Sequence, residues 1–239
     1  MLSVSSSSNA PSVTPWSCPL SLKSNRGSQR TPDLLNLMKK PAQTKVIVFD
    51  FDGVISNSEA TAFEILHTAD PAFTREEWHK RFEGNVHDTK PNLLAREDFY
   101  KQYSPIAVDQ PIFEGIADAV VTLAKTFTLT INSSGATELI TQFLQKHTLD
   151  QHFPIILGFE ASTSKVAKLK QTFVELEVTA DDCIMVTDTL GDIREATKAN
   201  VRSIAVTWGF HDIATLRKGN PAAVATGPEQ LPELVASLL

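Results

Sequence analysis

The stretch that decides the fold is Val46-Ile47-Val48-Phe49-Asp50-Phe51-Asp52-Gly53. A short apolar run that ends in two carboxylates and a glycine is typical of a buried parallel strand whose carboxyl end reaches a ligand. Carboxylates two residues apart on an extended backbone point to the same side, and such a pair suits a hard cation with oxygen ligands, such as Mg²⁺. The same sequence also forms plain turns in which Gly53 takes a positive φ.

Three further polar motifs follow in a fixed order, and two of them come directly after strand-like runs. Their members are Ser133, Ser134 and Gly135; Lys165; and Asp188 with Asp192. Open α/β sheets bind ligands at the carboxyl ends of their strands. The ordered set therefore predicts one phosphoryl-transfer site to which all four motifs contribute.

Each of these motifs also has a plain structural explanation. A serine such as Ser133 is a common helix N-cap, and the same hydroxyl with free N–H groups makes an anion pocket. A lysine such as Lys165 is usually solvated, yet a cation at a helix N-terminus is slightly unfavourable, so an anionic partner is expected. Asp188 and Asp192 suit an N-cap and a first helical turn, or a second carboxylate group of a metal site.

The body of the chain alternates between strand-like and helical patterns. Residues 58–104 are an exception, because they are helical throughout, with a capping box at Thr74 and Glu77 and a helix that ends near Ser104-Pro105. The expected strands are residues 45–50, 127–132, 154–157, 183–187 and 201–206. Strands that alternate with helices predict an α/β fold, a Rossmann-like doubly wound parallel sheet with a small helical insert after the first strand.

The predicted division of the chain follows from this pattern. We expect a tail or targeting segment at 1–40, a core at 41–57 and 111–239, and the helical insert at 58–110. Ten of the first 30 residues are serine and no acidic residue precedes Asp33, which is typical of an organellar transit segment. A disordered tail, or true initiation at Met38, would give the same composition. We expect a cytoplasmic protein, or one of a plastid or mitochondrion if residues 1–37 are a transit peptide.

Composition excludes several classes of function. The net charge is −6 although the first 40 residues are basic, so the body is acidic and a nucleic-acid partner is not expected. No apolar stretch is long enough to cross a bilayer, so we expect no membrane partner. Only Cys18 and Cys183 are present, which implies no disulfide framework. The sequence does not give the oligomeric state.

The ordered motifs resemble those of the haloacid dehalogenase superfamily over residues 45–239. Residues 50–54 resemble its first motif, Ser133 its second, Lys165 its third, and Asp188 with Asp192 its fourth. The insert resembles the small helical C1-type cap of the phosphoglycolate phosphatase and β-phosphoglucomutase branch. The resemblance therefore implies a phosphoric monoester hydrolase with a cap over its active site.

The resemblance also implies a role for each motif residue. Asp50 would attack phosphorus and form an aspartyl-phosphate, and Asp52 would protonate the leaving oxygen and then activate water. Ser133 would hydrogen-bond a non-bridging oxygen, and Lys165 would balance the charge of Asp50 and the phosphate. Dehalogenases of this superfamily lack an acid two residues after the nucleophile, so the presence of Asp52 favours phosphorus chemistry.

The implied cofactor is Mg²⁺, which would neutralise phosphoryl charge. Its ligands would be the Asp50 carboxylate, the Asp52 main-chain carbonyl and Asp188. Asp192 would bind the ion directly or one shell further out.

The insert is expected to choose the substrate, a small phosphorylated metabolite. Trp78, Arg81 and Asn85 are the candidate contacts from the insert, and Ser134 and Gly135 those from the core. The histidines of the insert could touch the substrate, but a surface position is expected for them, and the aromatic residues that follow the last strand are expected to pack. Those histidines are His67, His79 and His87, and the aromatic residues are Trp208 and Phe210.

Two functions remain as alternatives to a Mg²⁺-dependent phosphatase. One is a sugar-phosphate mutase of the β-phosphoglucomutase type, which would depend on a bisphosphorylated activator. The other is a non-catalytic binding protein on the same fold, which the set of chemically competent residues disfavours.

Overall fold

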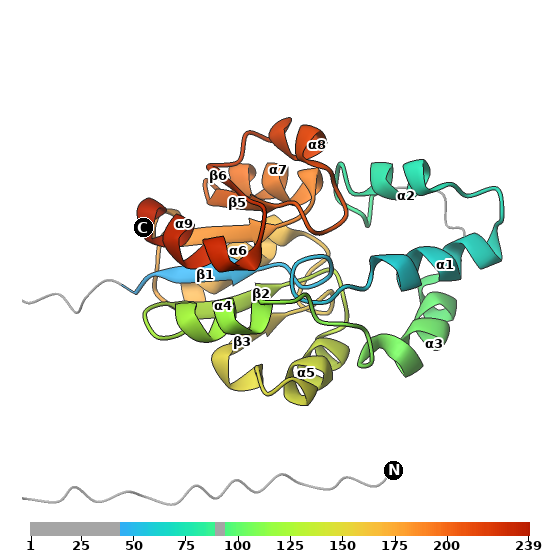
Figure 1. Cartoon of the computed structure of the whole chain (residues 1–239), viewed down its shortest axis with the longest axis horizontal. Helices are drawn as coiled ribbons and strands as arrows, with labels where there is room; N and C mark the ends of the chain where they lie inside the picture. The colour runs from blue at the N-terminus through green and yellow to red at the C-terminus, as the bar shows by residue number, and fades with distance from the viewer. Residues whose placement is uncertain (1–43, 89–93) are drawn as a thin grey trace, which may run out of the picture. The chain divides into compact units, whose positions relative to one another are not determined.

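A parallel sheet of six strands in the order β3-β2-β1-β4-β5-β6 organises the chain (Figure 1). The computed structural model describes residues 44–88 and 94–239. The strands are β1 (Val46–Phe49), β2 (Thr128–Asn132), β3 (Ile155–Leu157), β4 (Cys183–Thr187), β5 (Arg202–Val206) and β6 (Ala223–Ala225). The predicted α/β class and parallel sheet are confirmed.

The order of the strands places a ligand crevice beside β1. Val46 of β1 pairs with Thr128 of β2 on one side and with Cys183 of β4 on the other. The strands that follow β1 in the chain, β2 and β3, lie on one side of it. The later strands β4, β5 and β6 lie on the other side, so the direction in which strands are added reverses at β1. Ligands of open α/β sheets bind at such a reversal, outside the carboxyl ends of the strands.

Alternate residues of the strands enter two separate apolar layers, as expected for a sheet covered on both faces. Ile47 and Phe49 pack with one set of helices, and Val46 and Val48 with the other. The first set is α4 (Ile116–Leu123), α5 (Thr137–Lys146) and α9 (Leu231–Leu238), and the second is α6 (Lys165–Glu175) and α7 (Leu190–Lys198). The sheet is therefore doubly wound.

Three helices lie beyond the carboxyl end of β1 (Figure 1). They are α1 (Glu59–Ala69), α2 (Arg75–Arg81) and α3 (Arg96–Ala107). Phe63 of α1 and Trp78 of α2 share a small apolar cluster with Phe210 of the core. The capping box of Thr74 and Glu77 opens α2 as predicted. The treatment of residues 58–110 as a separate domain stays a prediction.

The predicted end of α3 near Ser104-Pro105 is wrong, because the helix continues to Ala107 with Pro105 inside it. Proline removes one backbone hydrogen bond and crowds the carbonyl four residues earlier. Tyr103 and Ala107 are nevertheless buried against Ile65 of α1. This packing holds the last turn in helical form.

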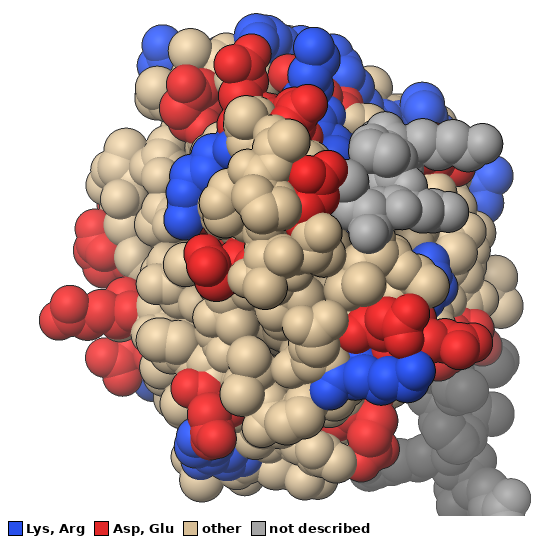
Figure 2. Space-filling view, turned by 90° about the vertical axis from the view of Figure 1, so that its right-hand side faces the viewer, with Lys and Arg blue, Asp and Glu red and all other residues tan. Residues whose placement is uncertain are grey.

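Figure 2 looks onto the side of the molecule that carries α1–α3, and it shows acidic and basic side chains next to one another. Such a mixed surface agrees with the expectation that no nucleic acid binds, which stays a prediction. Within the described ranges, no helix is long and apolar enough to span a membrane. Cys183 is a buried free cysteine. Cys18 and the expected targeting segment lie outside the described residues.

Candidate active site

Asp50 and Asp52 stand at the carboxyl end of β1, in a tight turn. The Asp50 N–H donates to the Val186 carbonyl of β4 (2.8 Å), which ties the start of the turn to the neighbouring strand. Gly53 has a φ of 79°, and a Cβ built on it would lie 1.9 Å from Oδ2 of Asp188. Glycine is therefore required here both for the backbone conformation and for the close approach of the carboxylate that follows β4.

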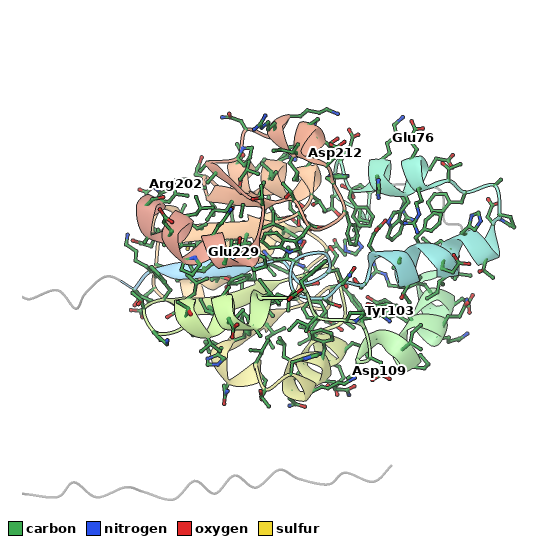
Figure 3. All side chains as sticks on the ribbon, in the orientation of Figure 1. Glu76, Tyr103, Asp109, Arg202, Asp212 and Glu229 are labelled. Atoms are coloured by element: carbon green, nitrogen blue, oxygen red, sulfur yellow. The ribbon has the colours of Figure 1, made fainter. Side chains whose placement is uncertain are left out.

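The Asp52 carboxylate is held between the core and the helices of the insert. Its Oδ1 accepts hydrogen bonds from the Ser58 hydroxyl (2.6 Å) and from the Tyr103 hydroxyl (3.5 Å). Figure 3 labels Tyr103 on α3, the helix that follows the gap in the described chain. Burial raises the pKa of Asp52 although the Ser58 bond and Lys165 oppose it. A carboxyl group with a raised pKa is suited to give up a proton in a reaction.

Ser133 follows β2, and its backbone N–H donates to the Leu157 carbonyl of β3 (2.9 Å). Its hydroxyl oxygen accepts from the Gly135 N–H (2.9 Å). The N-cap of α5 is Ala136, three residues later, so the N-cap explanation of Ser133 is wrong. The hydroxyl instead lies near Asp52, since a Cβ built on Gly135 would be 3.3 Å from both side chains.

Lys165 is a buried ammonium group that bridges two carboxylates. Its Nζ lies 2.7 Å from Oδ1 of Asp50 and 2.5 Å from Oδ2 of Asp192. Burial alone would lower the pKa of Lys165, but Asp192 and Asp50 outweigh it and the pKa is raised. The anionic partners that were expected of this lysine are therefore these two side chains. Its own backbone N–H donates to the Glu195 carboxylate (3.1 Å).

Asp188 follows β4 and is fully buried. The Phe210 N–H donates to its Oδ2 (2.8 Å), while its Oδ1 has no hydrogen-bond partner among the described residues. Burial raises the pKa of Asp188 to about 7. The residue is not a helix N-cap, because Thr189 caps α7. The expectation that Phe210 only packs was thus incomplete, since its backbone also holds Asp188.

Asp192 lies in the first turn of α7. Its Oδ2 accepts from the Thr187 hydroxyl (3.0 Å) as well as from Lys165. Burial opposes ionisation of Asp192, but the neighbouring ammonium outweighs it and the pKa is lowered. Asp192 is therefore an ionised group that is already supplied with partners.

The carboxylates of Asp50 and Asp188 are compatible with the predicted Mg²⁺ site. Among residues 44–88 and 94–239, no three His, Cys, Asp or Glu side chains are grouped as metal ligands. The predicted set needs only two carboxylates, those of Asp50 and Asp188, because Asp52 would contribute its main-chain carbonyl. An unpartnered, buried Asp188 Oδ1 is the kind of atom that a cation would satisfy. The partners of Asp192 favour a place one shell further out.

Two cavities meet at this site. A cavity of about 60 Å³ is lined by Asp50, Lys165 and Asp192, among others. A larger cavity of about 250 Å³ extends from Asp52 and Ser134 towards α1, α2 and α3. The two share the lining residues Asp52, Phe82, Val86, Ser134 and Phe210. A molecule with a small polar end and a larger remainder would match this shape.

The predicted contacts of the insert divide between the cavity and the loop around it. Trp78 and Arg81 line the larger cavity, as do Ser134 and Gly135 of the core. Asn85 lines neither cavity, because its Nδ2 donates to the Thr163 carbonyl (2.9 Å). The Asn85 side chain therefore ties the insert to the loop before α6.

Sequence reasoning missed Lys168 near the site and preferred a surface position for His87. Lys168 is buried on α6, where its Nζ donates to the Ser133 carbonyl, and burial and Lys165 lower its pKa to about 8. Its spacing of three from Lys165, which puts both on one helix face, was the available signal. His87 was expected at the surface but lines the larger cavity, and burial and Arg96 lower its pKa to about 4.

Comparison with known proteins gives the family of the chain. The family model of haloacid dehalogenase-like hydrolases matches residues 47–206, which is more than half of the chain. The chain belongs to the haloacid dehalogenase-like hydrolase family. The predicted family and the prediction of a hydrolase are both confirmed.

Relatives and solved structures agree with this assignment. A phosphoglycolate phosphatase from Synechococcus elongatus is 24% identical over 209 residues, which cover 82% of this chain and 99% of the relative. A phosphoglycolate phosphatase from Vibrio parahaemolyticus is 26% identical over 46% of this chain and 50% of its own length. The crystal structure of a predicted phosphatase from Clostridium acetobutylicum has a TM-score of 0.70 at 19% identity, covering 82% of this chain and 100% of its own. A hydrolase from Pseudomonas syringae has a TM-score of 0.69 at 17% identity, with the same coverage of both chains.

Proposed function

We propose that this hydrolase is a Mg²⁺-dependent phosphatase that cleaves a small phosphate monoester through an aspartyl-phosphate intermediate. The observation that carries the proposal is the buried Lys165 ammonium between Asp50 and Asp192, next to a cavity that begins at Asp52. The relatives named phosphoglycolate phosphatase support this reaction type. Residues 58–110 would act as the cap that closes over the substrate.

In the first step Asp50 attacks phosphorus, and the bond between phosphorus and the leaving oxygen breaks. The Phe51 N–H and the Lys165 ammonium fix the orientation of the Asp50 carboxylate, since both donate to Oδ1. Oδ2 is then the oxygen left to attack. Asp52 gives its proton to the leaving oxygen, so that the product leaves as an alcohol.

In the second step Asp52, now ionised, takes a proton from water, and this water attacks the phosphorus of the aspartyl-phosphate. The bond between phosphorus and Asp50 breaks, which releases phosphate and restores the carboxylate. The Ser133 hydroxyl, whose oxygen accepts from the Gly135 N–H, and the Ser134 N–H would donate to the phosphoryl oxygens. Bound Mg²⁺ supplies neutralisation of the phosphoryl charge during both transfers.

The proposal is tested by phosphate release from p-nitrophenyl phosphate with and without Mg²⁺. We expect release only with Mg²⁺, and a loss on the order of 10⁴-fold or more in Asp50→Asn, as for other nucleophile deletions. Asp118→Asn, on the exposed face of α4, is the matched control and should keep wild-type activity. Activity that survives Asp50→Asn in a folded protein would contradict the proposal.

A further inference from the structure

If the proposed phosphatase function holds, the volume and the lining of the larger cavity indicate what kind of leaving group the substrate has. The phosphate would lie near Asp50, and Asp52 marks the leaving oxygen, so the rest of the substrate would occupy the 250 Å³ that extends from Asp52. A cavity of about 150 Å³ is enough to hold benzene. The space is therefore larger than a two-carbon leaving group such as glycolate requires.

Most of the lining of this cavity is apolar or aromatic, which favours a leaving group with an apolar body. Rings come from both the insert and the core. They are Trp78, Phe82, Phe99, Tyr100, Tyr103 and Phe210. The rings also pack on one another, for example Trp78 on Phe82 with centroids 4.7 Å apart and Phe99 on Tyr103 at 5.4 Å, so the walls are preformed.

Three buried nitrogen atoms of this lining have no hydrogen-bond partner among the described residues. They are Nε1 of Trp78, Nε of Arg81 and Nε2 of His87. The first two are always donors. Arg96 donates to Nδ1 of His87 (2.7 Å), which leaves the proton of the neutral ring on Nε2, so the third is a donor as well. All three atoms therefore await an acceptor.

The charged side chains of the cavity lining also favour an acceptor, and one that is anionic. Arg81 and Arg96 both line the cavity, and neither pairs with a carboxylate among residues 44–88 and 94–239. Stacking on rings holds both guanidinium groups, over Trp78 at 5.9 Å and over Phe159 at 4.8 Å. The one carboxylate in the lining is Asp52, at the catalytic end. The end away from Asp50 is therefore cationic and rich in donors.

We propose that the natural substrate is the phosphate monoester of a hydroxy acid with an apolar, ring-sized body, whose anionic group is bound by Arg81 and Arg96. The aromatic walls would contact the body, and the unpartnered donors would hydrogen-bond the anionic oxygens. Arg81 is the main specificity-determining residue, because it lines the cavity on Trp78 and its Nε has no hydrogen-bond partner among the described residues.

The experiment compares two esters that differ only in charge, 4-(carboxymethyl)phenyl phosphate and its primary amide, 4-(carbamoylmethyl)phenyl phosphate. The methylene group keeps the leaving-group basicity of the two phenols nearly equal. We expect the acid to have a kcat/KM roughly tenfold or more above that of the amide, because a charge-assisted hydrogen bond is lost with the amide. The acid should also have a lower KM than 2-phosphoglycolate, which cannot fill the cavity.

Variants assign the effect to the arginines. Arg81→Met should bring the ratio of acid to amide close to one, and Arg96→Met, at an exposed position, should lower it as well. Lys80→Met removes the neighbouring positive charge of α2 outside the cavity and should keep the wild-type ratio.

The outcomes separate this inference from the proposed function. Equal rates for acid and amide, a lower KM for 2-phosphoglycolate, or an unchanged ratio in both arginine variants would overturn the inference. If p-nitrophenyl phosphate is hydrolysed but neither the acid nor the amide ester is, the inference fails and the phosphatase function stands. If no phosphate ester is hydrolysed, the proposed function itself fails.

Discussion

The two ends of the active-site cavity are built differently. At the core end, Lys165 pairs with Asp50 and Asp192, and Thr187 donates to Asp192. At the insert end, Trp78, Arg81 and His87 carry buried nitrogen atoms that have no hydrogen-bond partner in the part of the chain that the structure describes. The groups proposed to act on the phosphate are therefore held in place by other side chains, whereas those proposed to surround the leaving group would gain their partners from the substrate. On the proposed function, the core would determine the reaction and the insert the choice of substrate.

The largest effect is expected where the two ends meet, at Asp52. Asp52→Asn removes the proton donor, and we expect kcat for an alkyl phosphate to fall roughly 10²- to 10⁴-fold. Formation of the phosphoenzyme from p-nitrophenyl phosphate should fall less, since that leaving group needs no proton. Rapid-quench measurement of the two substrates checks this. An equal loss with both would mean that Asp52 is not the acid.

Asp188→Asn tests the carboxylate at the core end whose Oδ1 has no hydrogen-bond partner among the described residues. We expect the Mg²⁺ concentration for half-maximal activity to rise roughly 10- to 100-fold. Burial raises the pKa of Asp188 from its ordinary 3.8 to about 7, so between these pH values the folded protein binds a proton that the unfolded protein does not. The metal-free wild type should therefore lose stability as the pH rises from about 4 to about 7.

In Asp188→Asn this loss of stability with rising pH should be smaller, and Mg²⁺ should no longer raise the melting temperature. Thermal unfolding in EDTA and in Mg²⁺, at pH 5 and pH 7.5, measures both. A variant that responds to Mg²⁺ like the wild type would remove Asp188 from the ligand set.

Lys168→Met has a smaller expected effect, because Lys168 acts through the Ser133 carbonyl and not on the phosphate. We expect a loss of roughly tenfold in kcat/KM, comparable with one hydrogen bond. The folded-state pKa of Lys168 is about 8, below the ordinary 10.5, so the unfolded protein holds the proton to higher pH. The free energy of unfolding should therefore rise between about pH 8 and pH 10 in the wild type.

Denaturant unfolding at pH 7.5 and pH 9.5 compares Lys168→Met with Lys170→Met, an exposed control on the same helix. Only the first should lose the rise in stability. If both variants behave like the wild type, Lys168 is solvated and does not support Ser133.

The smallest effect is expected at the edge of the insert. Asn85→Ala removes the bond to the Thr163 carbonyl, which is worth about 0.5–1.5 kcal/mol. We expect KM to rise roughly 2- to 10-fold with kcat unchanged, because the insert is held less firmly over the core. A fall in kcat with constant KM would instead place Asn85 in the chemical step.

The core end of the site could be predicted from the sequence for a physical reason. β1 and β4 are continuous apolar runs, and each is followed at once by a carboxylate, so the strand fixes where Asp50 and Asp188 must lie. Parallel strands bring these ends to one edge of the sheet. The predicted parallel sheet and the family follow from the same elements.

The parts that could not be predicted lack such a pattern. β6 has three residues and α8 (Ile213–Arg217) has five, which is too short for a periodic signal. Asn85 and His87 lie in a loop, where neither a period of two nor one of 3.6 tells which way a side chain points. A lysine is expected to be solvated from its residue type alone. Only the packing of α6 on the sheet shows that Lys168 is buried.

The most direct test of the central claim is chemical trapping of the phosphoenzyme. Wild-type protein that turns over p-nitrophenyl phosphate with Mg²⁺ is quenched in acid, reduced with borohydride, digested and sequenced by mass spectrometry. An acyl-phosphate at Asp50 would be converted to homoserine at that position alone, and Asp50→Asn would show none. Homoserine at another aspartate, or steady turnover with no trapped residue, would contradict the account.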